Sequence, residues 1–241
     1  MKIKVADFNV QINNKFGLIE KQCKNYISCF DKADFVIDVS DEDIAAEKRR
    51  PTYQPGFSDA YIETVIVYRK LCFMLPERDA LMLHSAVFKL EDKVVALIAN
   101  SGVGKTTHMM NYKKLFGDAL TVINGDKPII RYIDSEIFVY GTPWCGKEGM
   151  NTNTKERLTD VCFLKRNDSN RTYQMEKSQA VSRILKQIYL PKTDLAADNT
   201  LKMLDLILTK CRVWEINCTK DIDSAKISYT AIFKEGEKDE A

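Results

Sequence analysis

The sequence predicts an α/β fold with a mixed sheet, and three observations lead to this prediction. Short apolar runs of strand length alternate along the chain with longer runs of helical character. A glycine-rich segment, residues 99–106, stands directly between one such apolar run and one helical run. The 241 residues, 45% of them hydrophobic, are enough for one sizeable domain with a smaller appendage.

Net charge and hydropathy exclude several classes of partner. The 36 Lys and Arg nearly cancel the 34 Asp and Glu, so the net charge of +2 gives no global reason to expect nucleic acid or an anionic membrane as a partner. No run approaches the roughly 18 apolar residues that span a bilayer, and the first residues lack the apolar segment of a signal peptide. We therefore expect a soluble, cytoplasmic protein whose specific chemistry is local.

The cysteines indicate a reducing compartment. There are seven, an odd number, and they are scattered without a Cys-x-x-Cys pair. With only two histidines in the chain, a zinc site of the usual ligand spacing has little support. We expect reduced, mostly buried thiols, with Cys145, in a Pro-Trp-Cys-Gly loop, the only one placed near chemistry.

Residues 1–59 are expected to form a small β-rich segment packed on the core. Its apolar stretches are short and lack helical periodicity, and residues 45–59, with two prolines, a glycine and three adjacent basic residues, predict a long exposed loop. From Ala60 to Leu75 the apolar pattern predicts a buried helix that Pro76 stops.

Residues 60–233 are expected to form the main domain, and residues 234–241 a charged, disordered tail. Strand, hairpin and helix signals follow one another through this range. They predict a hairpin of residues 81–90 and 93–99, a helix to about Phe116, a strand at 119–124, a hairpin of 128–133 and 136–141, strands at 161–166 and 213–218, and helices at 178–190 and 201–208.

The glycine-rich segment Ala99-Asn-Ser-Gly-Val-Gly-Lys-Thr106 matches the Walker A pattern except for alanine at its first position. Small residues let backbone N–H groups turn around phosphate oxygens, and the following helix points its positive end at the same anion. Lys105 is expected to neutralise phosphates and Thr106 to place a hydroxyl on Mg²⁺. Alanine at 99 is tolerable if its backbone angles are ordinary; the alternative interpretation is a fortuitous glycine turn. The expected nucleotide-binding residues are Asn100, Ser101, Gly102, Val103, Gly104, Lys105, Thr106 and Thr107.

Asp126 is the leading candidate for the carboxylate that works with the metal. It follows Lys105 by 126 − 105 = 21 residues, at the end of the strand after the phosphate-loop helix, where it is expected to face the phosphates. The alternative is a turn aspartate within Asn-Gly-Asp-Lys-Pro. His84, on the strand before the loop, is either a site residue or a satisfied core or surface histidine, whereas His108 is expected on the surface or in packing.

Four segments in this order resemble the C-terminal kinase domain of HPr kinase/phosphorylase and the wider superfamily that includes ATP-type phosphoenolpyruvate carboxykinase. They are Leu83-His84-Ser85, the short hairpin, the 99–107 segment and Val122-Ile-Asn-Gly-Asp-Lys-Pro128. The resemblance implies a P-loop kinase domain in which His84, Lys105 and Asp126 are catalytic and Thr106 and Asp126 hold the metal. Family members often carry two consecutive aspartates, whereas this chain has Gly125-Asp126, so the catalytic base is left open among Asp126, His84 and Glu148.

The expected function is that of an ATP- or GTP-using, Mg²⁺-dependent kinase that phosphorylates a Ser or Thr hydroxyl of a peptide or small protein. The resemblance also implies an assembly of identical chains. A small-molecule or carboxykinase-like enzyme is one alternative, and a nucleotide-binding regulatory or peptide-delivery module is another. The loop of residues 141–157 either closes over substrate, with Lys147 near a transferred phosphate, or is a surface loop anchored by Trp144.

Overall fold

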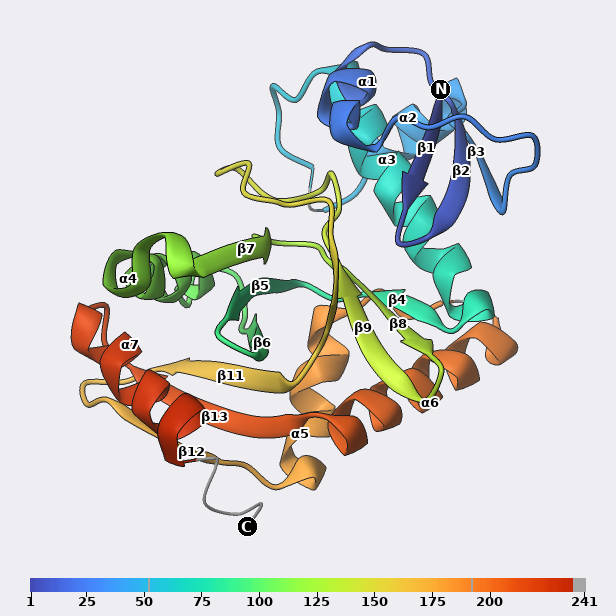
Figure 1. The fold of residues 1–241 in the computed structure, drawn as a ribbon. Coiled ribbons are helices and arrows are strands. Elements are labelled where there is room, and N and C mark those ends of the chain that lie inside the picture. The colour runs from blue at the N-terminus through green and yellow to red at the C-terminus, as the bar shows by residue number, and fades with distance from the viewer. Residues whose placement is uncertain (52, 192, 236–241) are drawn as a thin grey trace.

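A computed structural model describes residues 1–51, 53–191 and 193–235. It confirms a mixed α/β fold with mixed sheets (Figure 1). The strands are β1 (Lys2–Val5), β2 (Phe8–Asn13), β3 (Phe35–Asp38), β4 (Ala80–Met82), β5 (Ser85–Leu90), β6 (Lys93–Ile98), β7 (Leu120–Asn124), β8 (Ile129–Ile133), β9 (Glu136–Tyr140), β10 (Lys155–Arg157), β11 (Asp160–Arg166), β12 (Arg171–Gln174) and β13 (Arg212–Cys218).

Helices of very different length separate these strands. The α-helices are α1 (Leu18–Gln22), α2 (Asp41–Lys48), α3 (Asp59–Met74), α4 (Lys105–Phe116), α5 (Lys177–Ile184), α6 (Asp194–Lys210) and α7 (Ile222–Tyr229). The short 3₁₀ turns are η1 (Lys24–Tyr26), η2 (Leu75–Arg78), η3 (Gly117–Ala119) and η4 (Leu185–Gln187), and the π-helical η5 (Thr230–Glu235) follows α7. Within the described ranges, no helix is long and apolar enough to cross a membrane.

The central sheet has six strands in the order β12-β13-β11-β6-β5-β7. Strands β6, β11 and β13 run parallel, whereas β5 is antiparallel both to β6 and to β7. Strand β7 therefore runs in the same direction as β6, two places away. As a result, the segments that follow β6 and β7 leave the sheet at the same edge, which is the usual place for a ligand site in such sheets.

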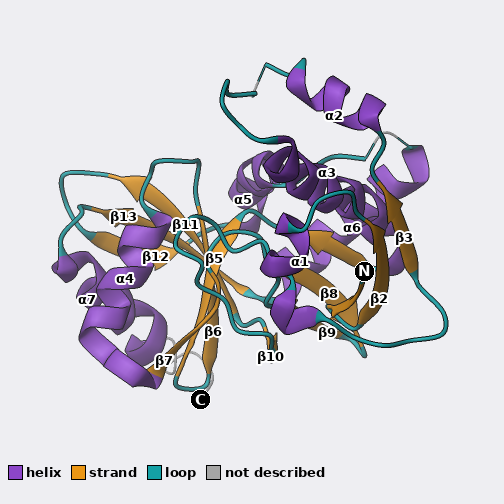
Figure 2. Ribbon diagram, turned by 90° about the horizontal axis from the view of Figure 1, so that it is seen from above, coloured by secondary structure: helices purple, strands orange, loops and turns teal. Residues whose placement is uncertain are grey.

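Each face of the central sheet is covered by its own apolar core. On one face α4, α7 and η5 contribute Met109, Tyr112, Ala225 and Phe233. The other face packs against α5, α6 and a second sheet of order β10-β9-β8-β4. Figure 2 shows the helices of these two layers on opposite sides of the strands. Because both faces are buried, β6 is apolar along most of its length rather than alternating.

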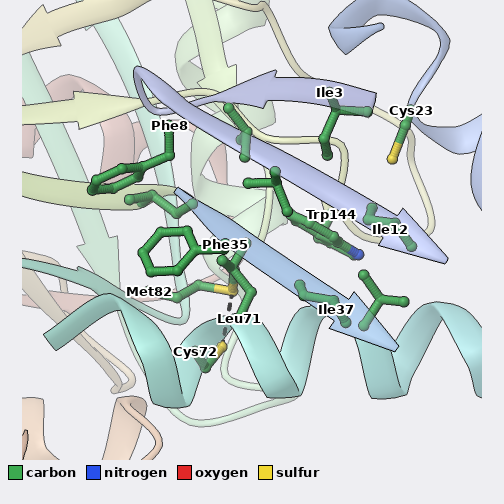
Figure 3. Close-up of a cluster of buried hydrophobic side chains, with 14 of the residues drawn as sticks. Ile3, Phe8, Ile12, Cys23, Phe35, Ile37, Leu71, Cys72, Met82 and Trp144 are labelled. Atoms are coloured by element: carbon green, nitrogen blue, oxygen red, sulfur yellow. Dashed lines mark hydrogen bonds between the residues drawn. The ribbon is translucent and has the colours of Figure 1, made fainter. Parts of the chain in front are cut away.

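A third core joins the N-terminal sheet, β1-β2-β3, to helix α3. Figure 3 shows Ile3, Ile12 and Ile37 of the sheet facing Leu71 of α3, with Trp144 inserted among them. Trp144 comes from the loop after β9 and is 5% exposed. The N-terminal strands, α3 and that loop therefore share one packed interior.

Several predicted elements are confirmed. Helix α3 begins after Ser58, whose hydroxyl accepts from the N–H of Tyr61, and it ends one residue before the predicted limit. The hairpin β5–β6 turns at Glu91-Asp92, and β8–β9 turns at Asp134-Ser135. The thiols were expected to be reduced and mostly buried, and all seven are free, with five of them buried.

Two predicted elements are wrong. Within the predicted loop of residues 45–59, the first four residues are the end of helix α2, which a capping box between Ser40 and Asp43 starts. The predicted strand of residues 81–90 is broken, because β4 belongs to the second sheet and β5 to the central one. His84 lies in that break and not within a strand.

The predicted disordered tail also needs correction at its start, since Lys234 and Glu235 belong to the helical segment η5. The rest of the tail, residues 236–241, lies outside the described residues.

Candidate nucleotide-binding site

The glycine-rich segment forms a loop between β6 and the first turn of α4. Gly102 and Gly104 have φ values of +82° and +118°, which side chains other than glycine rarely adopt. Ala99 is not among the residues with positive φ and packs in the core under the loop, which meets the condition for tolerating alanine there. The loop thus turns at its glycines and delivers Lys105 to the N-terminus of α4.

Lys105 is 8% exposed and sits under the loop. Its ammonium group donates to the carbonyl of Ala99 at 2.8 Å and lies 3.1 Å from Nε2 of His84. Burial lowers the pKa of Lys105 to about 8, although the nearby carboxylate of Asp126 opposes this. A buried cation with few compensating charges is suited to bind an anion from solvent.

Asp126 is held in place by the asparagine at the end of β7. The buried Asn124 accepts hydrogen bonds through Oδ1 from the N–H groups of Asp126 and Lys127, at 2.9 and 2.7 Å. Its amide group donates in turn to Thr142. Asp126 is therefore both a turn aspartate and a cavity residue, and the turn fixes where its carboxylate stands.

The carboxylate of Asp126 has a nitrogen partner at each oxygen. Nε2 of His84 lies 3.1 Å from Oδ1, and the ammonium of Lys127 lies 2.7 Å from Oδ2. Burial alone raises the pKa of this carboxyl, but these hydrogen bonds and charges outweigh burial and lower the pKa to about 2. Asp126 is thus an anion across the physiological pH range.

His84 stands where three separate segments meet. Its backbone N–H donates to the carbonyl of Gln187, and the N–H of Ser85 donates to the carbonyl of Asp126. Its ring reaches Gln187 Oε1 through Nδ1 at 3.0 Å and faces Lys105 and Asp126 through Nε2. The structure therefore brings together the three predicted catalytic residues, although they come from different segments of the chain.

Gln187 is a site residue that sequence reasoning missed. It is 7% exposed, at the end of η4, and its amide nitrogen donates to Oδ1 of Asn100 at 2.9 Å. It thereby links the first polar residue of the glycine-rich loop to the ring of His84. No sequence signal marked it, because it lies within a predicted helix far from every motif.

The single aspartate after β7 has a steric explanation. A Cβ on Gly125 would lie 2.8 Å from the backbone oxygen of Cys145 and 3.4 Å from that of Met150, so the loop after β9 leaves no room for a side chain. The N–H of Gly125 also donates to the carbonyl of Met150. The loop occupies the space that a second carboxylate would need.

A cavity of about 600 Å³ lies over these residues. It is lined by the glycine-rich loop, by His84, Asp126 and Lys127, by residues of the loop after β9, and by one face of α3; the lining is Gln22, Tyr61, Thr64, Val65, Tyr68, His84, Asn100, Ser101, Gly102, Gly104, Lys105, Thr106, Thr107, Gly125, Asp126, Lys127, Trp144, Gly146, Lys147 and Glu148. This volume suits a ligand of nucleotide size.

One expected nucleotide-binding side chain is absent from this lining. Val103 lines a neighbouring cavity instead, because its side chain packs under the loop against the core, and its carbonyl accepts from Arg166 at 2.8 Å. Cys145 contributes no lining either, and burial raises the pKa of its thiol. His108 is buried against Ser224 and Ser228, as expected for a packing residue.

The cavity offers two side-chain oxygen ligands for Mg²⁺, but one of them, the carboxylate of Asp126, already has nitrogen partners. Thr106 and Asp126 both line the cavity, and Mg²⁺ is typically held by one or two protein oxygens together with substrate phosphates and water. Within the described residues, no group of three or more His, Cys, Asp or Glu forms a metal site. A metal here would depend on phosphate oxygens and would displace a nitrogen partner of Asp126.

Comparison with known proteins yields a distant structural likeness. No family model matches the chain, and no curated protein matches it. Among solved structures, the HPr(Ser) kinase/phosphatase from Coxiella burnetii is similar, with a TM-score of 0.39 and 9% identity, over 66% of this chain and 99% of that one. A likeness this distant does not assign the chain to a family.

Proposed function

We propose that the protein is a phosphotransferase that uses ATP or GTP with Mg²⁺ and phosphorylates a Ser or Thr hydroxyl of a peptide or small protein. The observation that supports this proposal is that Lys105, His84 and Asp126 lie next to one another beside the glycine-rich loop and line one cavity. Phosphoryl transfer needs chiefly positioning and charge neutralisation, which such a group supplies.

Each residue has a role that follows from its place. Lys105 and the backbone N–H groups of the loop bind phosphate oxygens, and Lys105 leaves its contact with His84 to do so. Thr106 and Asp126 hold the metal, which when bound neutralises charge on the phosphates. Asp126 or His84 receives the hydroxyl proton; Glu148, which also lines the cavity, is the third candidate.

A second candidate function is a nucleotide-dependent binding module without efficient turnover. It is favoured by the carboxylate of Asp126, whose oxygens are both paired with nitrogen atoms and which has no acidic residue at the preceding position, because the loop after β9 fills that space. A small-molecule kinase remains a further alternative with the same phosphate site.

Transfer of labelled phosphate from ATP or GTP to a panel of Ser/Thr peptides, small proteins and small alcohols tests the proposal. Lys105→Ala and Asp126→Asn should abolish transfer, whereas Lys114→Ala, on the exposed side of α4, and Asp118→Asn, outside the cavity, should retain it. Retention of transfer by both site variants would contradict the site. Tight nucleotide binding without transfer to any acceptor would favour the binding module.

A further inference from the structure

A second, smaller hollow adjoins the nucleotide cavity on the outer side of α3. It has a volume of about 230 Å³ and is rich in aromatic rings; we call it the aromatic pocket, and its lining is Glu47, Tyr53, Phe57, Tyr61, Ile62, Val65, Tyr68, Arg69 and Tyr189. We propose that the aromatic pocket receives an aromatic or long aliphatic side chain of the peptide or protein that accepts the phosphate. This inference rests on the proposed function and specifies its substrate.

The aromatic pocket and the nucleotide cavity share a wall. Tyr61, Val65 and Tyr68 line both. They stand at positions i, i+4 and i+7 of α3 and therefore lie along one face of that helix. A chain that places a hydroxyl in the larger cavity can continue along this face into the smaller one.

The shared wall lies on the carboxylate side of the phosphate site. The ammonium of Lys127 is 2.7 Å from Oδ2 of Asp126 and 5.8 Å from the ring centroid of Tyr68, so it connects the carboxylate to α3. In phosphoryl transfer the attacking oxygen enters in line with the leaving oxygen, on the side of the terminal phosphate away from the rest of the nucleotide. Tyr68, which lies on the far side of Asp126 from the glycine-rich loop, therefore faces the acceptor.

The chemistry of the aromatic pocket favours an uncharged, apolar occupant. Its one carboxylate, that of Glu47, is 8% exposed and pairs with Arg69 and with Arg50. The hydroxyl groups of Tyr68 and Tyr189 lie 2.9 Å apart, so one donates a hydrogen bond to the other. The two charged lining residues, Glu47 and Arg69, pair with each other, so the lining itself carries no net charge.

The rings also leave surface for a partner. Phe57 and Tyr61 pack ring to ring at 4.6 Å, yet they remain 38% and 44% exposed, and Tyr189 is 38% exposed. Exposed aromatic residues grouped around a hollow bury large apolar area at low cost in side-chain entropy, which is typical of residues that dominate binding energy.

The test compares Phe57→Ala with Tyr173→Ala, an aromatic residue of the same 38% exposure on β12, outside both hollows. Each protein is assayed for labelled-phosphate transfer to a Ser-containing peptide library with one degenerate position at a time. The wild type and Tyr173→Ala should select an aromatic or long aliphatic residue at one fixed distance from the serine. Phe57→Ala should lose about tenfold of this preference and bind nucleotide as the wild type does.

The other outcomes separate this inference from the proposed function. Unchanged selection in Phe57→Ala overturns the inference and leaves the kinase intact. Weaker nucleotide binding by Phe57→Ala with unchanged peptide selection also overturns the inference, because the aromatic pocket then holds the nucleobase of the nucleotide. If the wild type transfers phosphate to no peptide, the proposed function fails. The same library, arrayed without nucleotide, then tests the aromatic pocket by direct peptide binding. If wild type and Phe57→Ala bind the arrayed peptides equally, the inference is overturned. If only Phe57→Ala loses binding to peptides with an aromatic or long aliphatic residue, the inference is supported.

Discussion

If the cavity binds a nucleotide as proposed, the affinity should depend on pH between 7 and 9 through Lys105. Burial lowers its pKa to about 8, whereas phosphates bound beside it would stabilise the charged form. Below pH 8 the ammonium is present before the nucleotide arrives; above pH 8 a proton must be taken up on binding. Affinity is therefore full below the pKa and decreases as the pH rises through it.

The size of the effect follows from the charged fraction. With a pKa of about 8, the charged fraction of Lys105 falls from about nine-tenths at pH 7 to about one-tenth at pH 9. If only the charged form binds, the dissociation constant rises about tenfold, which corresponds to about 1.4 kcal/mol. Equilibrium titration with ADP at constant ionic strength and without metal measures it.

Lys105→Arg is the informative control, because a guanidinium group stays charged over this range. Its dissociation constant should stay nearly constant from pH 7 to pH 9, even if its affinity at pH 7 is below that of the wild type. A wild-type dissociation constant that does not change, or an equal slope in Lys105→Arg, refutes the reasoning.

Three further predictions concern single residues. Asp126→Asn should reduce phosphate transfer about 100-fold or more without weakening metal-free ADP binding; a loss of that binding would mean that the carboxylate is structural. Gln187→Leu should lower transfer about tenfold through a misplaced His84 while nucleotide affinity persists. Gln187→Glu keeps the oxygen that faces Nδ1 of His84, although it loses the donor to Asn100, and should restore most of the rate; failure of that rescue would argue against positioning. Burial lowers the pKa of His108 to about 4, below its unfolded value of about 6.5, so stability decreases as the pH falls below 6.5. Urea unfolding should show a loss of about 2 kcal/mol between pH 7 and pH 5 that His108→Gln lacks, and an equal loss in the variant would contradict the assignment.

The sequence predicts the glycine-rich loop and its neighbours well because their geometry is local. The strand before the loop, the start of α4 and the two hairpin turns depend on residues close in the chain, and the structure confirms them. The mixed α/β class also follows from alternating strand and helix signals.

The features of the fold and of the candidate site that the sequence does not reveal depend on contacts between distant segments. His84 looks like a strand residue because its neighbours are apolar, yet the chain changes sheets there. Gln187 and His84 are 103 residues apart, and nothing in the local pattern of either reveals their hydrogen bond. The absence of a second aspartate at 125 likewise depends on Cys145 and Met150, which approach it from the loop after β9.

Helix α3 gives the N-terminal sheet an influence on chemistry that its strands never touch. Helix α3 lines the cavity over the glycine-rich loop as far as Tyr68, while Leu71, further along the helix, packs with Ile12 and Ile37 of the N-terminal sheet. A substitution that loosens this packing tilts the cavity wall without altering any residue of the site. In a genetic screen, changes in acceptor choice should therefore map to the interior of the N-terminal sheet, and second-site suppressors should map to α3.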